Sequence, residues 1–293
     1  MPLERYQKIL EGKELPKFKI AKEQGDLSEK AEEAKILLHS CNFCEHNCKA
    51  DRHNQAGYCG VGAEMRVTSE FLHISEEPEL VPSYTIFFAG CNMKCQYCQN
   101  HDISQNPRAG DAVTSWSLAY LIDSHPSAKN VNFVGGEPTP NLAGILAALK
   151  DVNINIPVVW NSNMYLSEKG MELLDGVVDI YLTDFKYGND KCAKRLSKID
   201  NYCSTIKRNH KLAEKSGELI IRHLLLPGHF ECCTKPILDW IAANLNNPEI
   251  NIMDQYKPDF EAHKYKEINN PIKPEDYDKA VQYAKSIGLT NLI

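Results

Sequence analysis

Several features that would assign the chain to other classes of protein are missing from its 293 residues. No apolar run is long enough to cross a membrane, and the first residues lack the apolar segment of a signal peptide. Acidic residues outnumber basic ones by 39 to 33, and the net charge of -6 leaves no basic excess for binding nucleic acid. Internal repeats and low-complexity tracts are also missing. We therefore expect a cytoplasmic globular protein that binds neither membranes nor nucleic acid.

Cysteine, in contrast, is abundant, with 11 residues in the chain. An odd number of cysteines without a signal peptide argues against a disulfide framework and in favour of metal binding in a reducing compartment. Seven of these cysteines fall in two tight clusters. The other four are expected to be free thiols in helices or loops: Cys192, Cys203, Cys232 and Cys233.

Short apolar or β-branched runs alternate with helical patterns from about residue 84 onward. The expected strands are 84–88, 130–134, 157–160, 178–182, 219–226 and 250–253, and the expected helices are 116–122, 142–149, 168–174, 206–215, 237–245 and 274–287. Strands that alternate with helices imply parallel pairing with right-handed crossovers. Six strands fit an α/β fold of the open, partial (β/α)6 TIM-like barrel type better than a closed barrel of eight strands.

Composition divides the chain into four parts. We expect an N-terminal helical segment (1–36), a small cysteine-rich metal-binding module (37–65), the partial barrel (66–260), and a C-terminal tail with a helix (261–293). The charged segment 73–78 between the module and the first barrel strand has two interpretations. It is either a solvated linker or a lip over the substrate cleft.

Three cysteines with the spacing C-x3-C-x2-C follow the first barrel strand: Cys91, Cys95 and Cys98. A four-iron cluster normally takes four thiolates, so three would leave one iron free to bind a small molecule. An open iron suits the amino and carboxylate groups of S-adenosylmethionine, whose reductive cleavage yields a 5′-deoxyadenosyl radical. Loops at the carboxyl ends of barrel strands carry active sites, which fits this position. The competing interpretation is a zinc site that His101 completes.

Polar residues follow the remaining strands, where the mouth of such a barrel is built. The run Gly135-Gly136-Glu137-Pro138 combines two glycines, which let the backbone approach a ligand closely, with a carboxylate that can accept a hydrogen bond from a methionine ammonium. The later strands contribute further candidate cofactor-binding residues: Asn163, Asp184, Lys186, Arg222 and Gln255. Lys186 or Arg222 would pair with the methionine carboxylate, and Gln255 would bond the ribose hydroxyls. The competing interpretation makes these residues strand-end caps and rim ion pairs.

The matching stretches FFAGCNMKCQYCQN, GGEP, VDIYLTDFKY, IRHLLLPG and MDQYKP resemble the radical S-adenosylmethionine (radical SAM) superfamily. Within it, the chain is similar to the pyruvate formate-lyase activating enzyme family, and especially to relatives with an added N-terminal cysteine module. The resemblance spans roughly residues 37–260. It implies a [4Fe-4S] cluster, S-adenosylmethionine as cofactor, and Tyr97 near the adenine. Characterised members abstract a hydrogen from a glycine of a partner enzyme.

The sequence departs from that family in two ways. It has Asp254-Gln255-Tyr256 at the last strand, where a histidine is expected, and it carries the extra cysteine module. Both departures leave the cofactor chemistry intact, but they leave the identity of the substrate open.

The N-terminal cluster has the spacing C-x2-C-x3-C-x10-C and consists of Cys41, Cys44, Cys48 and Cys59. Four thiolates so close in sequence suit a structural, tetrahedral zinc site. They also suit a fully ligated second iron–sulfur cluster that acts as an electron relay. We favour the iron–sulfur cluster, because the first cluster must receive an electron.

These features predict a radical SAM oxidoreductase that abstracts hydrogen from a protein, peptide or metabolite. One such reaction would be the activation of a glycyl-radical enzyme. A ferredoxin or flavodoxin would supply the electron. A second hypothesis is a maturase that rearranges or cross-links a peptide or protein. A hypothesis from another class is an iron–sulfur electron carrier or a zinc-stabilised binding protein. The carrier hypothesis leaves the three cysteines followed by GGEP unexplained.

Overall fold

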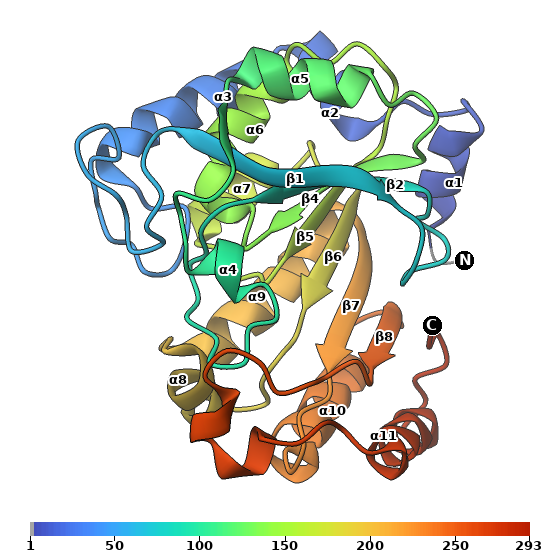
Figure 1. Ribbon diagram of the computed structural model, residues 1–293. Helices are drawn as coiled ribbons and strands as arrows, with labels where there is room; N and C mark the ends of the chain where they lie inside the picture. The colour runs from blue at the N-terminus through green and yellow to red at the C-terminus, as the bar shows by residue number, and fades with distance from the viewer. Residues whose placement is uncertain (1–2) are drawn as a thin grey trace.

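The computed structural model describes residues 3–293, in which helices surround one mixed, open sheet of eight strands (Figure 1). The spatial order of the strands is β3-β1-β2-β4-β5-β6-β7-β8. Their bounds are Met65–His73 (β1), Ser83–Phe88 (β2), Asp111–Val113 (β3), Asn130–Gly135 (β4), Val158–Ser162 (β5), Ile180–Asp184 (β6), Glu218–Leu224 (β7) and Glu249–Met253 (β8). The partial α/β barrel expected from the sequence is confirmed, since β2 and β4 to β8 pair in parallel.

All six expected strands are present, and their burial explains why the sequence revealed them. Every residue of β5 is buried, as are five of the six residues of β4. Parallel strands covered on both faces consist of nearly continuous apolar or β-branched residues, which form a strong pattern.

Two strands were not expected. β1 pairs antiparallel with β2 and with the short β3, so it adds two strands to the edge of the parallel sheet. The second half of β1 is mostly exposed, and both Phe71 and Leu72 are among the exposed apolar residues. An edge strand of this kind lacks the continuous apolar run of a central strand, and the expectation of six strands was therefore two short.

The α-helices include all the expected ones and two that were not expected, at residues 101–104 and 190–197. Their bounds are Glu4–Leu10 (α1), Lys17–Gln24 (α2), Asp26–Leu37 (α3), His101–Ser104 (α4), Ser115–Asp123 (α5), Leu142–Leu149 (α6), Glu168–Leu174 (α7), Asp190–Ser197 (α8), Tyr202–Ser216 (α9), Lys235–Asn244 (α10) and Pro274–Ser286 (α11). Thr114 caps α5 by accepting a hydrogen bond from the Ser117 amide at 3.0 Å. The longer unexpected helix is α8, which begins after the capping residue Asn189.

The segment 73–78 is a lip of the central cavity, and the linker interpretation is wrong. Glu77 is only 5% exposed and accepts a hydrogen bond from Asn251 on β8 at 3.0 Å. Glu76 lies 3.6 Å from the guanidinium of Arg222 on β7. Both glutamates therefore contact the far strands of the sheet, although they leave β1 at the opposite edge.

Helix α1 closes the inner face of the sheet. Its side chain Tyr6 and the preceding Leu3 form an apolar cluster with one residue from β5, two from β6 and one from β7: Val159, Ile180, Leu182 and Ile220. The carboxylate of Glu218 accepts hydrogen bonds from the first amides of the helix, those of Arg5 and Tyr6. Arg5 also forms an ion pair with the buried Asp179. No helix of residues 3–293 is both long and apolar enough to span a membrane.

Candidate active site

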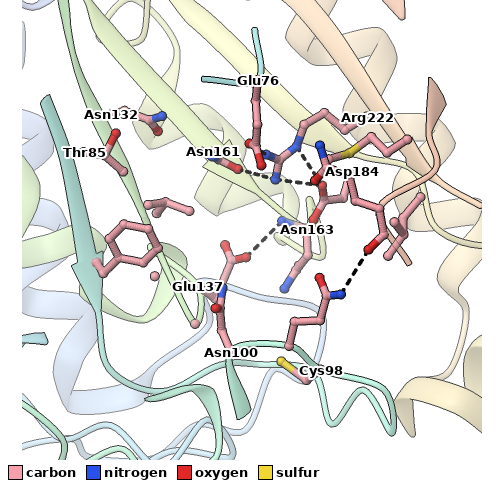
Figure 2. Close-up of a pocket in the computed structure, with 18 of the residues that line it drawn as sticks. Glu76, Thr85, Cys98, Asn100, Asn132, Glu137, Asn161, Asn163, Asp184 and Arg222 are labelled. Atoms are coloured by element: carbon pink, nitrogen blue, oxygen red, sulfur yellow. Dashed lines mark hydrogen bonds and ion pairs between the residues drawn. The ribbon is translucent and has the colours of Figure 1, made fainter. Parts of the chain in front are cut away.

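A cavity of about 380 Å³ lies at the carboxyl ends of the parallel strands (Figure 2). The sequence analysis named three cluster cysteines and nine cofactor-binding candidates, and all of them line this cavity: Cys91, Cys95, Cys98, Tyr97, Gly135, Gly136, Glu137, Asn163, Asp184, Lys186, Arg222 and Gln255. They come from six strands or the loops that follow them. The strand ends meet because parallel strands carry their carboxyl ends to one edge of the sheet.

The three cysteines are poised to act as metal ligands. Cys91 and Cys95 are buried, and Cys98 is half-buried. Each sulfur has a polar hydrogen-bond partner: the Met93 amide lies 3.3 Å from Cys91 Sγ, Ser197 Oγ 3.0 Å from Cys95 Sγ and Ser104 Oγ 3.2 Å from Cys98 Sγ. Burial raises the pKa of Cys95 to about 11, so in the free protein this thiol keeps its proton until a metal displaces it.

His101 does not join the three cysteines as a fourth ligand. Its Nδ1 lies 3.2 Å from the carbonyl oxygen of Cys98 and 3.4 Å from Asp259 Oδ1, and its ring stacks on Phe260. Ligand atoms around one zinc ion lie within about 4 Å of one another. Within residues 3–293, no group of metal-ligating side chains that tight includes these three cysteines. Three cysteine thiolates fit an iron–sulfur cluster that keeps one iron open.

Glu137 links the loop after β4 to the end of β5 through its carboxylate. Oε1 accepts hydrogen bonds from Ser162 Oγ at 2.7 Å and from Thr139, and Oε2 accepts one from the Asn163 amide at 3.0 Å. Burial raises the pKa of Glu137, while these hydrogen bonds oppose the shift. The side chain is therefore held rigidly, with Oε2 at the wall of the cavity and a lone pair left for a ligand.

A buried ionic network occupies the other end of the cavity in the view of Figure 2. Asp184 lies between Lys186 Nζ at 2.8 Å and Arg222 Nη2 at 3.1 Å. The guanidinium also bonds Asn161 Oδ1 at 2.9 Å and pairs with Glu76. Burial alone would raise the pKa of Asp184, but the two cations hold it below its ordinary value. Both cations line the cavity, and the ammonium of Lys186, with three donors, has Asp184 as its hydrogen-bond partner.

Sequence reasoning did not name Glu76 or Asn161 as site residues. Asn161 had a usable signal, since it stands in the same strand end as Asn163. Glu76 had only the weak signal of the charged segment 73–78, which was interpreted as a linker or a lip. Its contact with Arg222 depends on a lip that runs across the sheet from β1 to β7.

Tyr97 and Gln255 sit differently at the cavity. The hydroxyl of Tyr97 lies 2.8 Å from that of Tyr187, which in turn lies 2.6 Å from Ser197 Oγ, so the aromatic ring is fixed within the protein. Gln255 is exposed at the rim, and its backbone carbonyl accepts a hydrogen bond from Gln99. A buried ring and an exposed amide thus line the same cavity.

The N-terminal cysteines form a second group beside the first. All four line one small pocket with Arg52, whose Nη1 lies 3.9 Å from Cys41 Sγ. This module packs directly on the loop of the three cysteines, since a Cβ added to Gly90 would lie 3.1 Å from the carbonyl oxygen of Cys59. His46 Nε2 lies 2.6 Å from the carbonyl oxygen of Asn92. The two cysteine groups are thus in contact through Cys59, Gly90 and Cys91.

The sequence profile of the radical SAM superfamily matches residues 85–241, which is more than half of the chain and includes the three cysteines and the ionic network. The chain belongs to the radical SAM superfamily. As a radical SAM enzyme, it uses a [4Fe-4S] cluster and S-adenosylmethionine.

Individual relatives agree with this assignment. The chain is 49% identical over 267 residues to the uncharacterized protein MJ0674 of Methanocaldococcus jannaschii. The alignment covers 89% of this chain and 78% of that protein. It is 29% identical over 159 residues to the pyruvate formate-lyase-activating enzyme of Staphylococcus aureus. This alignment covers 50% of this chain and 62% of that enzyme.

Solved structures include Streptococcus suis SuiB bound to its precursor peptide SuiA, with a TM-score of 0.48 and 15% identity over 67% of this chain and 43% of SuiB. The same protein bound to S-adenosylmethionine gives a TM-score of 0.49. This chain spans less than half the length of SuiB.

Proposed function

We propose that Cys91, Cys95 and Cys98 hold the [4Fe-4S] cluster, that the central cavity binds S-adenosylmethionine, and that the enzyme abstracts hydrogen from a protein or peptide. One observation carries this proposal: the three thiols share a single cavity with the carboxylate of Glu137 and the cations Lys186 and Arg222. When bound, the reduced cluster supplies one electron to the sulfonium, which breaks a carbon–sulfur bond and leaves methionine and the 5′-deoxyadenosyl radical.

The residues of the chain bind and orient the methionine end of the cofactor. Glu137 Oε2 accepts a hydrogen bond from the methionine ammonium, and its fixed position sets where the ammonium lies. Lys186 and Arg222 pair with the carboxylate through charge-assisted hydrogen bonds. Asp184 holds both cations in place and offsets their repulsion. Tyr97 supports the adenine side.

A polypeptide substrate is supported by the match to a pyruvate formate-lyase-activating enzyme, although this match covers half of the chain. The lip residues Glu76 and Glu77 line the cavity from the side of β1 and place acidic groups near its mouth. The substrate would enter past this lip and bring one C–H bond to the cofactor. Transfer of that hydrogen yields 5′-deoxyadenosine and a substrate radical. A small iron–sulfur or flavin protein would deliver the electron.

The products of cofactor cleavage test this function. The anaerobically reconstituted and dithionite-reduced enzyme is expected to release 5′-deoxyadenosine and methionine slowly, and faster with its polypeptide substrate. Chromatography of the reaction mixture measures both products. Methylthioadenosine or S-adenosylhomocysteine in their place, from protein with an intact cluster, would show a different bond cleavage and an aminocarboxypropyl or methyl transferase.

Removal of one cavity cation should weaken cofactor binding. Lys186→Ala is expected to reduce the affinity for S-adenosylmethionine by about 1.5–3 kcal/mol, the value of a hydrogen bond to a charged group. Lys194→Ala is the matched control, because Lys194 makes a comparable ion pair with Asp200 at the exposed surface. Binding titrations under anaerobic conditions measure the difference. Equal affinities of the two variants would remove Lys186 from the cofactor site.

We further propose that Cys41, Cys44, Cys48 and Cys59 hold a second iron–sulfur cluster, which relays electrons to the first. Sulfurs around one zinc ion lie within about 4 Å of one another. Among the sulfurs of the described residues, no three of these four approach within 4.8 Å of each other, and the same is true of the three radical SAM cysteines. A spread wider than that of a single-ion site fits a cluster, in which each thiolate binds a different iron.

A single substitution distinguishes these ligands. Cys44→Ser is expected to lower the iron content by the share of one cluster, to leave the zinc content unchanged, and to leave the first cluster assembled. The control is Cys203→Ser, since Cys203 is half-buried on α9 and outside both clusters. Elemental analysis of the reconstituted proteins gives both metals. Loss of zinc in place of iron would establish a structural zinc site, and unchanged metal would exclude a metal site.

A further inference from the structure

Three cysteines outside the two clusters converge at one point. The Sγ atoms of Cys192, Cys232 and Cys233 all lie within 4.8 Å of one another, and those of Cys232 and Cys233 are 3.9 Å apart. Cys192 stands in the first turn of α8, whereas the adjacent pair stands in the π-helical turn Phe230–Thr234 between β7 and α10. The sequence analysis expected free thiols in helices or loops, and these cysteines are free, but it did not anticipate that three of them converge.

We propose that these three cysteines bind one zinc ion, at a site separate from both iron–sulfur sites. Three thiolates at about 2.3 Å from one zinc ion have sulfurs about 4 Å apart, as the adjacent pair already does. The ion would displace three protons to solvent and form an anionic tris-thiolate complex, with no change of oxidation state. No fourth His, Cys, Asp or Glu of residues 3–293 joins the group. Water or a solvent ligand fills the fourth position, which solvent reaches from the side of the exposed Cys232.

Asn189 supplies the donors that such an anionic site requires. Its Nδ2 lies 3.4 Å from Cys192 Sγ and 3.8 Å from Cys233 Sγ, and it donates to the carbonyl of Cys232 at 2.7 Å. Its Oδ1 accepts a hydrogen bond from the Cys192 amide at 2.8 Å. One side chain therefore orients all three cysteines. Outer partners of this kind fix metal ligands and tune their affinity.

The backbone around the site explains why two consecutive cysteines can both be ligands of one ion. The carbonyl of His229 accepts hydrogen bonds from the amides of both Cys233 and Thr234, and π-helical turns of this kind are rare and frequent at functional sites. A Cβ added to Gly188 would lie 2.7 Å from the carbonyl oxygen of Cys233. The loop after β6 is therefore pressed against the turn after β7, and a bound ion would join the two.

This junction lies close to the active-site wall. The loop that ends at Gly188 begins with Asp184, Lys186 and Tyr187, which line or support the cofactor cavity. A zinc ion on Cys192, Cys232 and Cys233 would therefore hold this loop against β7 from outside the cavity. The ion makes no contact with the cofactor, and its role is to fix the position of the loop.

Zinc titration of the full-length protein tests the proposal. After anaerobic reconstitution of the iron–sulfur sites, zinc is added in competition with a chromophoric chelator. The wild type and Cys203→Ser should each bind one zinc ion per chain that Cys232→Ser does not bind. Cys232 is exposed, so its replacement should leave the fold intact, which circular dichroism checks. Equal zinc binding by Cys232→Ser, or none by the wild type, would overturn the proposal.

A second variant keeps the test independent of cysteine loss. Asn189→Asp retains an oxygen that caps α8 but removes the N–H donor and adds a negative charge beside the thiolates. Its zinc affinity should be about 10- to 100-fold lower than that of the wild type. In the wild type, zinc should also suppress alkylation of Cys232 while leaving that of Cys203 unchanged. Unchanged affinity of Asn189→Asp together with unprotected Cys232 would contradict the site, as would a disulfide among the three cysteines.

Discussion

Simultaneous replacement of Cys91, Cys95 and Cys98 with alanine is expected to reduce 5′-deoxyadenosine formation to the level of a reaction without enzyme. All three thiolates proposed to hold the [4Fe-4S] cluster are then missing, so no electron reaches the cofactor. The sulfurs contact the Met93 amide, the Ser197 hydroxyl on α8, the Ser104 hydroxyl on α4 and the Asn163 amide group after β5. Alanine removes only these small contacts. The folded protein should therefore survive with its catalytic chemistry lost.

Two measurements check this result. Chromatography detects the nucleoside product, and electron paramagnetic resonance detects the reduced cluster, whose signal should shift in the wild type when S-adenosylmethionine is added. The control is Cys203→Ala, which lies outside all three cysteine groups and should keep both signals. Retained cofactor cleavage in the Cys91, Cys95 and Cys98 variant would exclude these residues as the cluster ligands.

The largest expected loss of stability comes from Gly135→Ala. Gly135 has a φ of +115°, and a Cβ placed there would lie 2.1 Å from the Phe88 amide nitrogen and 2.3 Å from its carbonyl oxygen. These atoms belong to the backbone of β2, which cannot move away without losing its pairing with β4. Overpacking and strained φ together should lower the free energy of unfolding by about 3 kcal/mol or more.

Gly176→Ala is the matched control for this prediction. Gly176 also has a positive φ, of +69°, but no heavy atom lies within 4 Å of an added Cβ. Backbone strain alone should therefore cost about 1–2 kcal/mol. Anaerobic urea unfolding of both variants measures the difference. Equal losses would mean that the sheet accommodates a side chain between β2 and β4, contrary to the close approach in the structure.

The residues that sequence patterns could place are those at the ends of buried parallel strands. Glu137 directly follows the turn after β4, Asp184 ends β6 and Arg222 lies on β7, and the sheet brings the carboxyl ends of such parallel strands together. The contacts that these residues make with one another could not be predicted from the strand pattern. The pairing of Asp184 with Arg222 depends on the register of β6 against β7, which places the two residues directly opposite each other.

Segments whose burial is decided by tertiary packing escaped the sequence analysis. β1 is exposed along its second half, and α8 has a single large apolar residue, Leu196, among its eight, DKCAKRLS, so neither shows a long apolar run. The convergence of Cys192 with Cys232 and Cys233 is a product of the same packing. Cys192 lies on the helix after β6, and the other two cysteines lie in the turn after β7. They meet only because α8 packs against that turn.

Helix α1 has a consequence for how the chain reaches its native state. Its partners Asp179 and Glu218 are made long after Arg5 and Tyr6 during synthesis, so the contact closes one of the longest loops in the molecule. Ordering so long a loop is entropically costly before its contacts form, which favours a late step in folding. Until then Val159, Ile180 and Ile220 remain uncovered. A chain shortened to the barrel alone would keep this apolar face permanently exposed and should tend to aggregate.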